Sequence, residues 1–574
     1  MMRKLKISGR VVWNPLMLIG ALMIAAGIAG CGGPAATAVP AATAVPAGAA
    51  AVAQPKAATT APAAASAAKK GGGTLIIAMT ASDVPIADAQ PNQGFEGFRF
   101  VGYQLGDGLT RWDLGQDKEP SGVMPGLATS WEVDPKDPQR WTFHLRDNVK
   151  FHDGTDWNAD AAIWGLNRAK QCASCPEKAA HYNPNQARQI GFRIAAIDDW
   201  EKKDDLTIGL HTDVITSFVP WNVLYFLFPS PTRVEQEGQD DYGLNPAGTG
   251  PWKFVKLTPR EKLEMERWDG YWGTKTAADK LVLLPMPEAT SRLASLRAGQ
   301  VSWIEVPPPD AIPGLRDDGF QVMLNPYPHT WPYQLFLERP PFNNKNIRIA
   351  ANYAVDREGL CNDLLNGTCI PMISQVYPGH PWYGDPPRKF NYDPEKSCEM
   401  VKAEGLDRVK FTVLTSTSGS GQMLPVPMNE FLQRTMKVAC FDMDMIAVDW
   451  GTFGAYQREH FWDTYEARNG STGTVDPYSA FVRLFHTRSF PPKAINRGHY
   501  SNPEMDRLIE QAEQEFDPAE LDKILTKINE FANEEAIWLN IVHDLNPRVL
   551  APNVKDMIHA QSWFVDLQAP WVDE

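Results

Sequence analysis

The sequence lacks the short motifs that identify many enzymes. It has no G-x-S-x-G nucleophile turn, no H-E-x-x-H zinc pair and no G-x-x-x-x-G-K-[ST] phosphate loop. Its 11 histidines are scattered, and none forms a helical i, i+4 pair suited to a metal. We therefore expect no enzyme activity, no metal and no cofactor. A secreted hydrolase stays open as an alternative, because an active site need not show in a sequence.

The chain is also poor in positive charge. Once the four basic residues near its start are set aside, 51 lysines and arginines face 69 acidic residues. Such an acidic balance argues against nucleic acid or anionic lipid as the main partner. It permits a cationic ligand without requiring one.

Long apolar runs are missing after residue 31, and the one present is short. Leu16 to Ala29 is a run of 14 apolar or glycine residues behind a basic segment. A membrane span needs roughly 20 such residues, so the run fits the core of a signal peptide over 1–30. Ile28-Ala29-Gly30-Cys31 is similar to a bacterial lipobox, in which Cys31 is lipidated. An ordinary signal peptide with a chance cysteine is the alternative.

Residues 31–70 have no bulky aromatic side chain and no charge before Lys56. They contain the tandem repeat AATAVP at 35–40 and 41–46. A segment of this composition cannot bury enough apolar surface to offset the entropy of ordering it. We expect a disordered tether that holds a globular domain away from a membrane surface.

Six cysteines remain after Cys31, an even number that favours disulfides in an exported chain. We expect the pairs Cys361–Cys369, Cys398–Cys440 and Cys172–Cys175, although six cysteines allow 15 connectivities. Zinc is the alternative for the last pair, with His181 as a third ligand. It ranks lower because structural zinc takes four protein ligands and no fourth lies nearby.

Strand and helix patterns alternate through residues 71–574, which indicates an α/β fold. Helices are predicted at 159–169, 289–298, 346–365, 394–404, 425–438, 503–514 and 518–534. Strands are predicted at 72–79, within 140–151, and at 206–211, 252–257, 262–268, 280–286 and 410–415.

The stretch VKFHDGTDWNADAA, residues 149–162, has the look of an active site because a histidine stands among several aspartates. We interpret it instead as a strand end, a tight turn at Asp153-Gly154 and a helix start capped by Asn158. His152 is then a structural residue.

Five blocks together resemble the extracellular solute-binding proteins of ABC importers, family 5, the class of dipeptide, oligopeptide and nickel binding proteins. These blocks are VMPGLATSWEVD and its continuation at 123–160, GTGPWKFVKL and its continuation at 248–273, SRLASLRAGQVSWIE at 291–305, FNNKNIRIAANYAVDREGL at 342–360 and YSNPEMDRLIEQAEQEFDPAE at 500–520. They follow the order found in that family.

The resemblance implies a periplasmic-binding-protein-like fold with two lobes joined by a hinge and an extra inserted domain. By analogy, domain I takes 71–113, 248–324 and 546–574, domain II takes 114–247, and domain III takes 325–545. It also implies a monomer that binds a small solute by lobe closure and delivers it to permease subunits with a cytoplasmic ATPase. We expect the protein in the periplasmic space or on the outer face of the cell membrane.

Peptide-binding members of this family hold the peptide amine with an aspartate four residues before a proline. The matching proline here is Pro477, and Gly473 stands in the place of that aspartate. This departure puts standard recognition of a free amine in doubt. Asp476 itself is expected to form a turn with Pro477, although it stays a candidate contact.

The resemblance also places several aromatic and polar residues beside the cleft. Aromatic faces can stack on peptide side chains, sugars or cations, and arginine or asparagine can bind carboxylates or hydroxyls. A core role is the alternative for each of the aromatic residues. The candidates are Phe95, Tyr103, Trp331, Tyr333, Trp450, Phe453, Arg468, Asn469 and Asp476.

Peptides rank first among the expected solutes, followed by oligosaccharides and then other solutes such as metal chelates. Gly473 and the aromatic content move saccharides closer to peptides. A sensor that passes ligand to a signalling partner is an alternative role for the same fold.

Overall fold

The computed structural model describes residues 71–417, 424–458, 464–491 and 493–574. The predicted signal peptide, the predicted lipidation site Cys31 and the predicted tether lie outside the described residues. Within those ranges, we find no helix with the length and apolar character that a membrane span requires.

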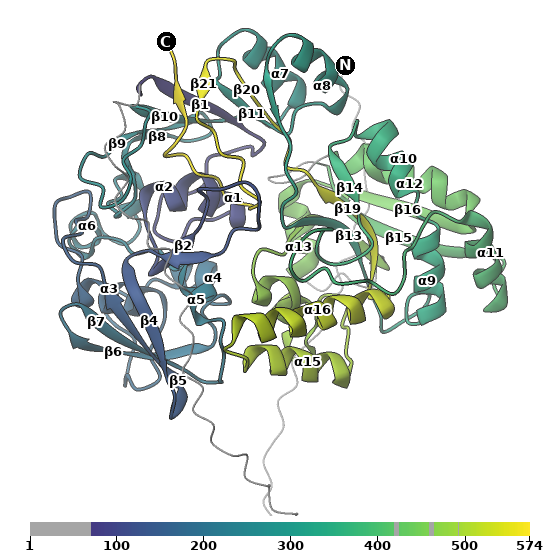
Figure 1. Cartoon of the computed structure of the whole chain (residues 1–574), viewed down its shortest axis with the longest axis horizontal. Coiled ribbons are helices and arrows are strands. Elements are labelled where there is room, and N and C mark those ends of the chain that lie inside the picture. Colours follow the sequence, from purple (N-terminus) through teal and green to yellow (C-terminus); the bar gives the residue numbers. More distant parts are fainter. Residues whose placement is uncertain (1–70, 418–423, 459–463, 492) are drawn as a thin grey trace, which may run out of the picture. The chain divides into compact units, whose positions relative to one another are not determined.

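One seven-stranded sheet, called here the β1 sheet, collects strands from distant parts of the chain (Figure 1). Strand β1 runs parallel to both of its neighbours, whereas the outer pairs are antiparallel. Its order is β12 (Gln321–Met323), β20 (Arg548–Leu550), β11 (Trp303–Glu305), β1 (Thr74–Met79), β10 (Lys280–Pro285), β9 (Lys262–Arg267) and β8 (Trp252–Thr258). Helices α7 (Ala289–Arg297) and α8 (Ile312–Asp317) pack beside this sheet.

A four-stranded antiparallel sheet, called the β5 sheet, lies within residues 128–212. Its order is β4 (Ala128–Asp134), β5 (Asp137–Leu145), β7 (Thr207–Thr212) and β6 (Ile197–Asp204). In β5, Trp141, Phe143 and Leu145 are buried, as the alternating sequence predicts. Helix α3 (Ala159–Ala169) packs on this sheet.

The third large sheet, called the β13 sheet, carries the central strand β13, which is buried along its whole length. Its order is β14 (Cys369–Pro371), β19 (Trp538–Asp544), β13 (His329–Leu335), β17 (Ala467–Asn469), β15 (Val409–Ser416) and β16 (Phe441–Val448), with β18 (Thr472–Gly473) also paired to β13. Helices α9 (Lys345–Tyr353) and α12 (Pro425–Val438) bury apolar side chains in the same core as this sheet.

Several predicted helices have the expected bounds because their caps are local. Asn158 accepts a hydrogen bond from the Ala161 amide at the start of α3, and Asp517 caps α16 (Pro518–Glu534) in the same way. Figure 1 shows α15 (Pro503–Glu513) side by side with α16. The other helices are α1 (Phe95–Gly97), α2 (Tyr103–Leu105), α4 (Pro184–Ile190), α5 (Val219–Val223), α6 (Pro231–Glu237), α10 (Arg357–Gly359), α11 (Pro394–Ala403), α13 (Trp450–Arg458) and α14 (Arg483–Phe485).

The prediction of one helix over 346–365 is wrong. Helix α9 ends at Tyr353, and a separate helical segment begins at Arg357. The side chain of Asp356 accepts a hydrogen bond from the Gly359 amide, so it caps a new helix start. The apolar periodicity continues across the break and hides it.

The six described cysteines form three disulfides, and these are the pairs expected above. They join Cys172 to Cys175, Cys361 to Cys369 and Cys398 to Cys440. The first bond uses the two thiols on which the zinc alternative depended. His181 instead stacks on Trp164 with a ring separation of 4.2 Å.

Candidate ligand-binding site

Two segments of chain connect the β1 sheet with the β13 sheet near one place. The first lies between β12 and β13, and the second lies between β19 and β20. They are joined by a hydrogen bond of 3.0 Å from the Asn325 amide to the Leu545 carbonyl. Any movement of one sheet against the other must bend both segments together.

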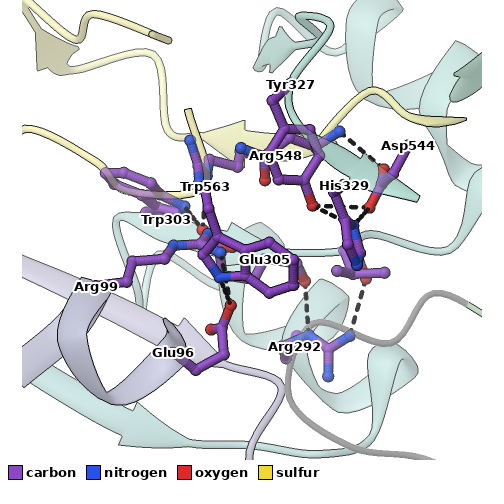
Figure 2. A network of polar contacts seen from close by, with 12 residues as sticks. Glu96, Arg99, Arg292, Trp303, Glu305, Tyr327, His329, Asp544, Arg548 and Trp563 are labelled. Carbon is purple, nitrogen blue, oxygen red and sulfur yellow. Dashed lines mark hydrogen bonds and ion pairs between the residues drawn. The ribbon is translucent and has the colours of Figure 1, made fainter. Parts of the chain in front are cut away.

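Buried ion pairs surround this crossing (Figure 2). Glu305 of β11 accepts from Arg548 at 3.0 Å and from the Trp303 indole at 2.7 Å, and it also pairs with Arg99. Arg99 donates at 3.0 Å to Glu96, which also accepts from the indole of Trp563. We call this set the crossing network; its two arginines face two glutamates, so its charges balance.

A second group of polar residues lies on the first crossing segment and at the adjoining ends of β13 and β19. The Tyr327 hydroxyl contacts His329 Nδ1 at 2.6 Å and Asp544 at 3.0 Å. Burial and the nearby Asp544 carboxylate raise the pKa of Tyr327, so the phenol stays protonated. Figure 2 shows this group next to the crossing network.

Phe95 and Tyr103, two expected ligand contacts, belong to one aromatic cluster. Phe95 lies 5.3 Å from Trp563 and 5.9 Å from Tyr225, measured between ring centroids. Tyr103 meets Phe564 edge to face at 5.0 Å. The cluster therefore joins the chain near residue 100, the segment that follows α5 and the C-terminal segment.

Asp476 is buried and has two neutral partners. One carboxylate oxygen accepts from the Tyr225 hydroxyl at 2.7 Å, and the other accepts from the Ser479 amide at 2.7 Å. The second bond is the turn role expected for an Asp-Pro pair. The first bond extends from the β13 sheet region to the aromatic cluster.

The space beside Gly473 is filled. A Cβ atom at this position would lie 2.3 Å from Cε2 of Phe95 and 3.2 Å from Trp563. A larger residue at 473 would collide with the aromatic cluster, because real Cβ contacts are longer than 3 Å. The Phe95 ring therefore occupies the space that a side chain at position 473 would need.

Trp331 and Tyr333 are candidate ligand contacts for which a core role is the alternative, and both are buried. Both have 0% exposure, and both pack in the core between the β13 sheet and its helices. Side chains alternate along a strand, so these two share the face that the helices cover. Asn469 belongs with them: it accepts from Asn429 of α12 at 2.7 Å.

The other candidates of this sheet lie on its opposite face or beyond its edge. Arg468 donates to Gln334 at 3.1 Å, and its guanidinium lies 4.8 Å from the ring centroid of Phe453. Phe453 is buried, whereas Trp450 on the same helix is 41% exposed. Arg468 and Phe453 therefore form one contact, with Trp450 stacked on its outer side.

A small cavity of about 150 Å³ opens between the aromatic cluster and the β13 sheet region. Tryptophans and prolines form much of its lining, and Trp382 donates to Asp522 at 2.8 Å. Burial raises the pKa of Asp522. The walls of the cavity include Trp112, Trp221, Pro328, Trp382, Val475 and Gln561.

His152 has the structural role that the sequence predicts. Its Nδ1 accepts from the Gly248 amide at 3.3 Å, and its Nε2 lies 2.9 Å from the Gly250 carbonyl. Burial lowers the pKa of His152 to about 4, so the neutral ring binds the GTGPW segment. Among the described residues, no group of His, Cys, Asp or Glu is arranged to hold a metal ion.

Sequence reasoning missed two arginines of this region. Arg193 follows α4 and lies over the rings of Tyr225 and Phe95, at 3.9 and 4.4 Å from their centroids. Arg483 begins α14 and donates to the Gly473 carbonyl at 3.0 Å. Neither stands in a recognisable motif, and only the folded chain brings them to the same ring.

A fold with separate mixed sheets, double crossing segments and an aromatic and polar surface between them is typical of solute-binding proteins. The family model described as bacterial extracellular solute-binding proteins, family 5 Middle, matches residues 122–491. The chain belongs to this family. The resemblance found in the sequence is therefore confirmed, and so is the fold class.

Curated relatives agree with this assignment. The chain is 26% identical to the glutathione-binding protein GsiB of Pectobacterium atrosepticum, over 77% of this chain and 84% of the relative. It is 26% identical to the periplasmic oligopeptide-binding protein OppA of Haemophilus influenzae, over 79% and 85%. These relatives are binding proteins.

A solved structure has the same fold. The binding protein DppA from Helicobacter pylori, in complex with the peptide STSA, superposes with a TM-score of 0.74. The match covers 88% of this chain and 99% of that chain, at 21% identity.

Proposed function

We propose that the protein is a lipid-anchored substrate-binding protein that captures a small solute, a peptide in the first instance, and delivers it to an ABC permease. The observation that carries this proposal is the family match over residues 122–491. The printed names of the relatives, which bind glutathione or oligopeptides, favour peptides as the solute class. The anchor is Cys31, and the protein acts as a monomer without catalysis.

We further propose that the solute is bound between residues 325–545 and the rest of the folded chain. The proposed domain boundaries are supported by the strand content, because the β13 sheet uses only residues within 325–545. The β1 sheet uses strands from 74–79, 252–323 and 548–550 instead. Binding proceeds by bending of the two crossing segments, since domain closure uses a few residues between rigid bodies.

Within this site we propose Phe95, Tyr103, Asp476 and Arg468 as solute contacts. Trp450 and Phe453 extend this set. Trp331, Tyr333 and Asn469 already have core partners, so we leave them out of the proposed contact set.

Mass spectrometry of the solute that copurifies under native conditions tests this function. We expect the protein to release peptides whose chemical structure has not changed. Release of an oligosaccharide would keep the fold and change the solute class. Conversion of peptides or glycans into products by pure protein would contradict the binding role.

A further inference from the structure

Four arginines of the described chain are linked in a row by electrostatic repulsion, and two of them, Arg193 and Arg483, lie on the Phe95 ring of the aromatic cluster. Arg193 comes from the segment after α4, Arg468 from β17, Arg483 from α14, and Arg497 from the loop before α15. Arg193 repels Arg483, and Arg468 and Arg483 both repel Arg497. We call them the arginine cluster.

The arginine cluster has little negative charge to balance it. Asp476 is near enough to act on Arg483 electrostatically, but its two oxygens are occupied by Tyr225 and Ser479. Among the residues that the structure describes, no carboxylate comes within ion-pair distance, 4.0 Å, of any of the four guanidinium groups. Burial and mutual repulsion lower the pKa of Arg483 to about 10, which leaves it charged at neutral pH.

Hydrogen-bond donors in this cluster are also left without partners. Arg193 is 4% exposed, and its Nε and Nη1 atoms are buried with no acceptor. The Nε atom of Arg468 is also buried without an acceptor. The hydroxyls of Thr474 and Ser479, on either side of Asp476, are buried without partners as well.

Aromatic rings support the flat faces of these arginines and leave the donor edges for another group. Arg193 lies over Tyr225 and Phe95, and Arg483 lies 5.6 Å from the centroid of the same Phe95 ring. A ring face stabilises a cation but accepts none of its in-plane hydrogen bonds. The rings therefore hold both guanidinium groups in place. Arg193 keeps Nε and Nη1 without acceptors, whereas Arg483 is fixed by bonds from Nε to the Ser479 carbonyl and from Nη2 to the Gly473 carbonyl.

Other buried arginines of this chain are treated differently. Arg357 is fully surrounded by acceptors, including the carbonyls of Met372, Asn540 and Phe390. Arg168 makes two bonds to Asp88. Arg548 also has two buried donors without partners, but its Nε is bonded to the Glu305 carboxylate. Within the described residues, Arg193 lacks both acceptors for two donors and a carboxylate partner, and this combination needs another explanation.

We propose that the arginine cluster, with Thr474 and Ser479, is an anion subsite that binds a carboxylate of the solute. This inference rests on the proposed function and narrows its solute class to acidic solutes. Arginine matches the geometry of a carboxylate with two parallel hydrogen bonds. Because Gly473 offers no carboxylate, the solute is held here through its negative charge.

A chemical change to the solute mixture tests the proposal. The full-length protein is incubated with an enzymatic casein digest, and separately with the same digest after methyl esterification of its carboxylates. Retained peptides are identified by mass spectrometry after desalting, and the melting temperature is recorded. We expect retention and a raised melting temperature with the untreated digest only.

The three outcomes lead to different conclusions. Equal retention of both digests would overturn the anion subsite and leave the proposed function standing. Retention of neither would contradict peptide binding itself and this inference with it. The sequences of retained peptides also distinguish a carboxylate at the C-terminus from one on an Asp or Glu side chain.

Variants then locate the subsite. Arg193→Met and Arg483→Met should each weaken binding of a retained peptide on the order of 10- to 100-fold, the usual effect of losing a charge-assisted hydrogen bond. Arg193→Lys, which keeps the charge, should recover part of the affinity. The matched control is Arg188→Met, because Arg188 lies on α4 nearby and is exposed. An equal loss in the control, or no loss in either variant, would remove these residues from the site.

Discussion

The crossing network and the arginine cluster both bury arginine, and they do so in opposite ways. In the crossing network, Arg99 and Arg548 face Glu96 and Glu305 in equal number. In the arginine cluster, four guanidinium groups have one nearby carboxylate among the described residues, Asp476, which acts on Arg483 and already has neutral partners. Burial of a charge is unfavourable unless it is paired, so only the first arrangement has its charges paired.

The difference separates residues that support the fold from residues that wait for a partner. A balanced network contributes to one arrangement of the chain and loses stability when one member is removed. An unbalanced cluster lowers stability in the free protein, and an anion that enters it removes that cost. Measurements of unfolding and of binding should therefore give opposite results in the two regions.

The largest effect is expected from Glu305→Gln in the crossing network. The change leaves Arg99 and Arg548 buried with one glutamate fewer, so the free energy of unfolding should fall by about 3–5 kcal/mol. Urea denaturation followed by circular dichroism measures it. Glu266→Gln, on an exposed strand position of β9, is the control and should change little. A loss below about 1 kcal/mol would mean that the network does not stabilise the crossing.

Acid should protonate His152, whose neutral ring is hydrogen-bonded in the folded chain, and leave it as an unpaired buried cation. The pKa of His152 is lowered from 6.5 to about 4, because burial disfavours the charged ring. Between these values the unfolded chain binds more protons, so stability falls as the pH falls from about 6.5 and the loss is complete below about pH 4. The full loss is on the order of 3 kcal/mol.

Unfolding free energies of wild type and His152→Gln from pH 7 to 4 measure this contribution. The variant should be less stable at pH 7 and should lose less than wild type on acidification. Parallel curves would show that His152 does not titrate in this window. Solute affinity at pH 7 should be nearly the same in both proteins, since His152 binds the GTGPW segment and not the proposed site.

Gly473→Ala should disturb the contact that brings the aromatic cluster to the β13 sheet region. Its Cβ atom would lie 2.3 Å from Phe95, and overpacking of this kind costs about 1–3 kcal/mol. A double-mutant cycle with Phe95→Leu measures the coupling. The two changes together should cost less than their sum, whereas strict additivity would show that the ring does not fill this place.

The smallest effect on stability is expected from Arg193→Met in the arginine cluster. No hydrogen bond from its guanidinium is lost, so the free energy of unfolding without solute should change by less than about 1 kcal/mol or rise. Arg357→Met is the matched comparison, because the Arg357 guanidinium donates to five backbone carbonyls. Arg357→Met should lower the free energy of unfolding by several kcal/mol. Similar losses at both positions would erase the distinction between the two regions.

Local signals explain what could be predicted. The helices at 159–169, 425–438 and 518–534 have the predicted bounds, and Asn158 and Asp517 cap two of them from within the same segment. The break at Asp356 was missed because it interrupts an apolar pattern without proline or glycine at the break itself. The sequence does not decide whether Trp331 and Tyr333 are buried, since an aromatic side chain suits a core and a binding surface equally.

The sequence by itself determined the family, the α/β class and the turn role of the stretch around His152. These depend on residues that act within a few positions of one another or on blocks that occur in order. Only the tertiary structure decided that Phe95 fills the place beside Gly473 and that Arg193 meets Arg483 over one ring. Their positions are separated by hundreds of residues, and contact and charge balance at that range depend on how the sheets pack.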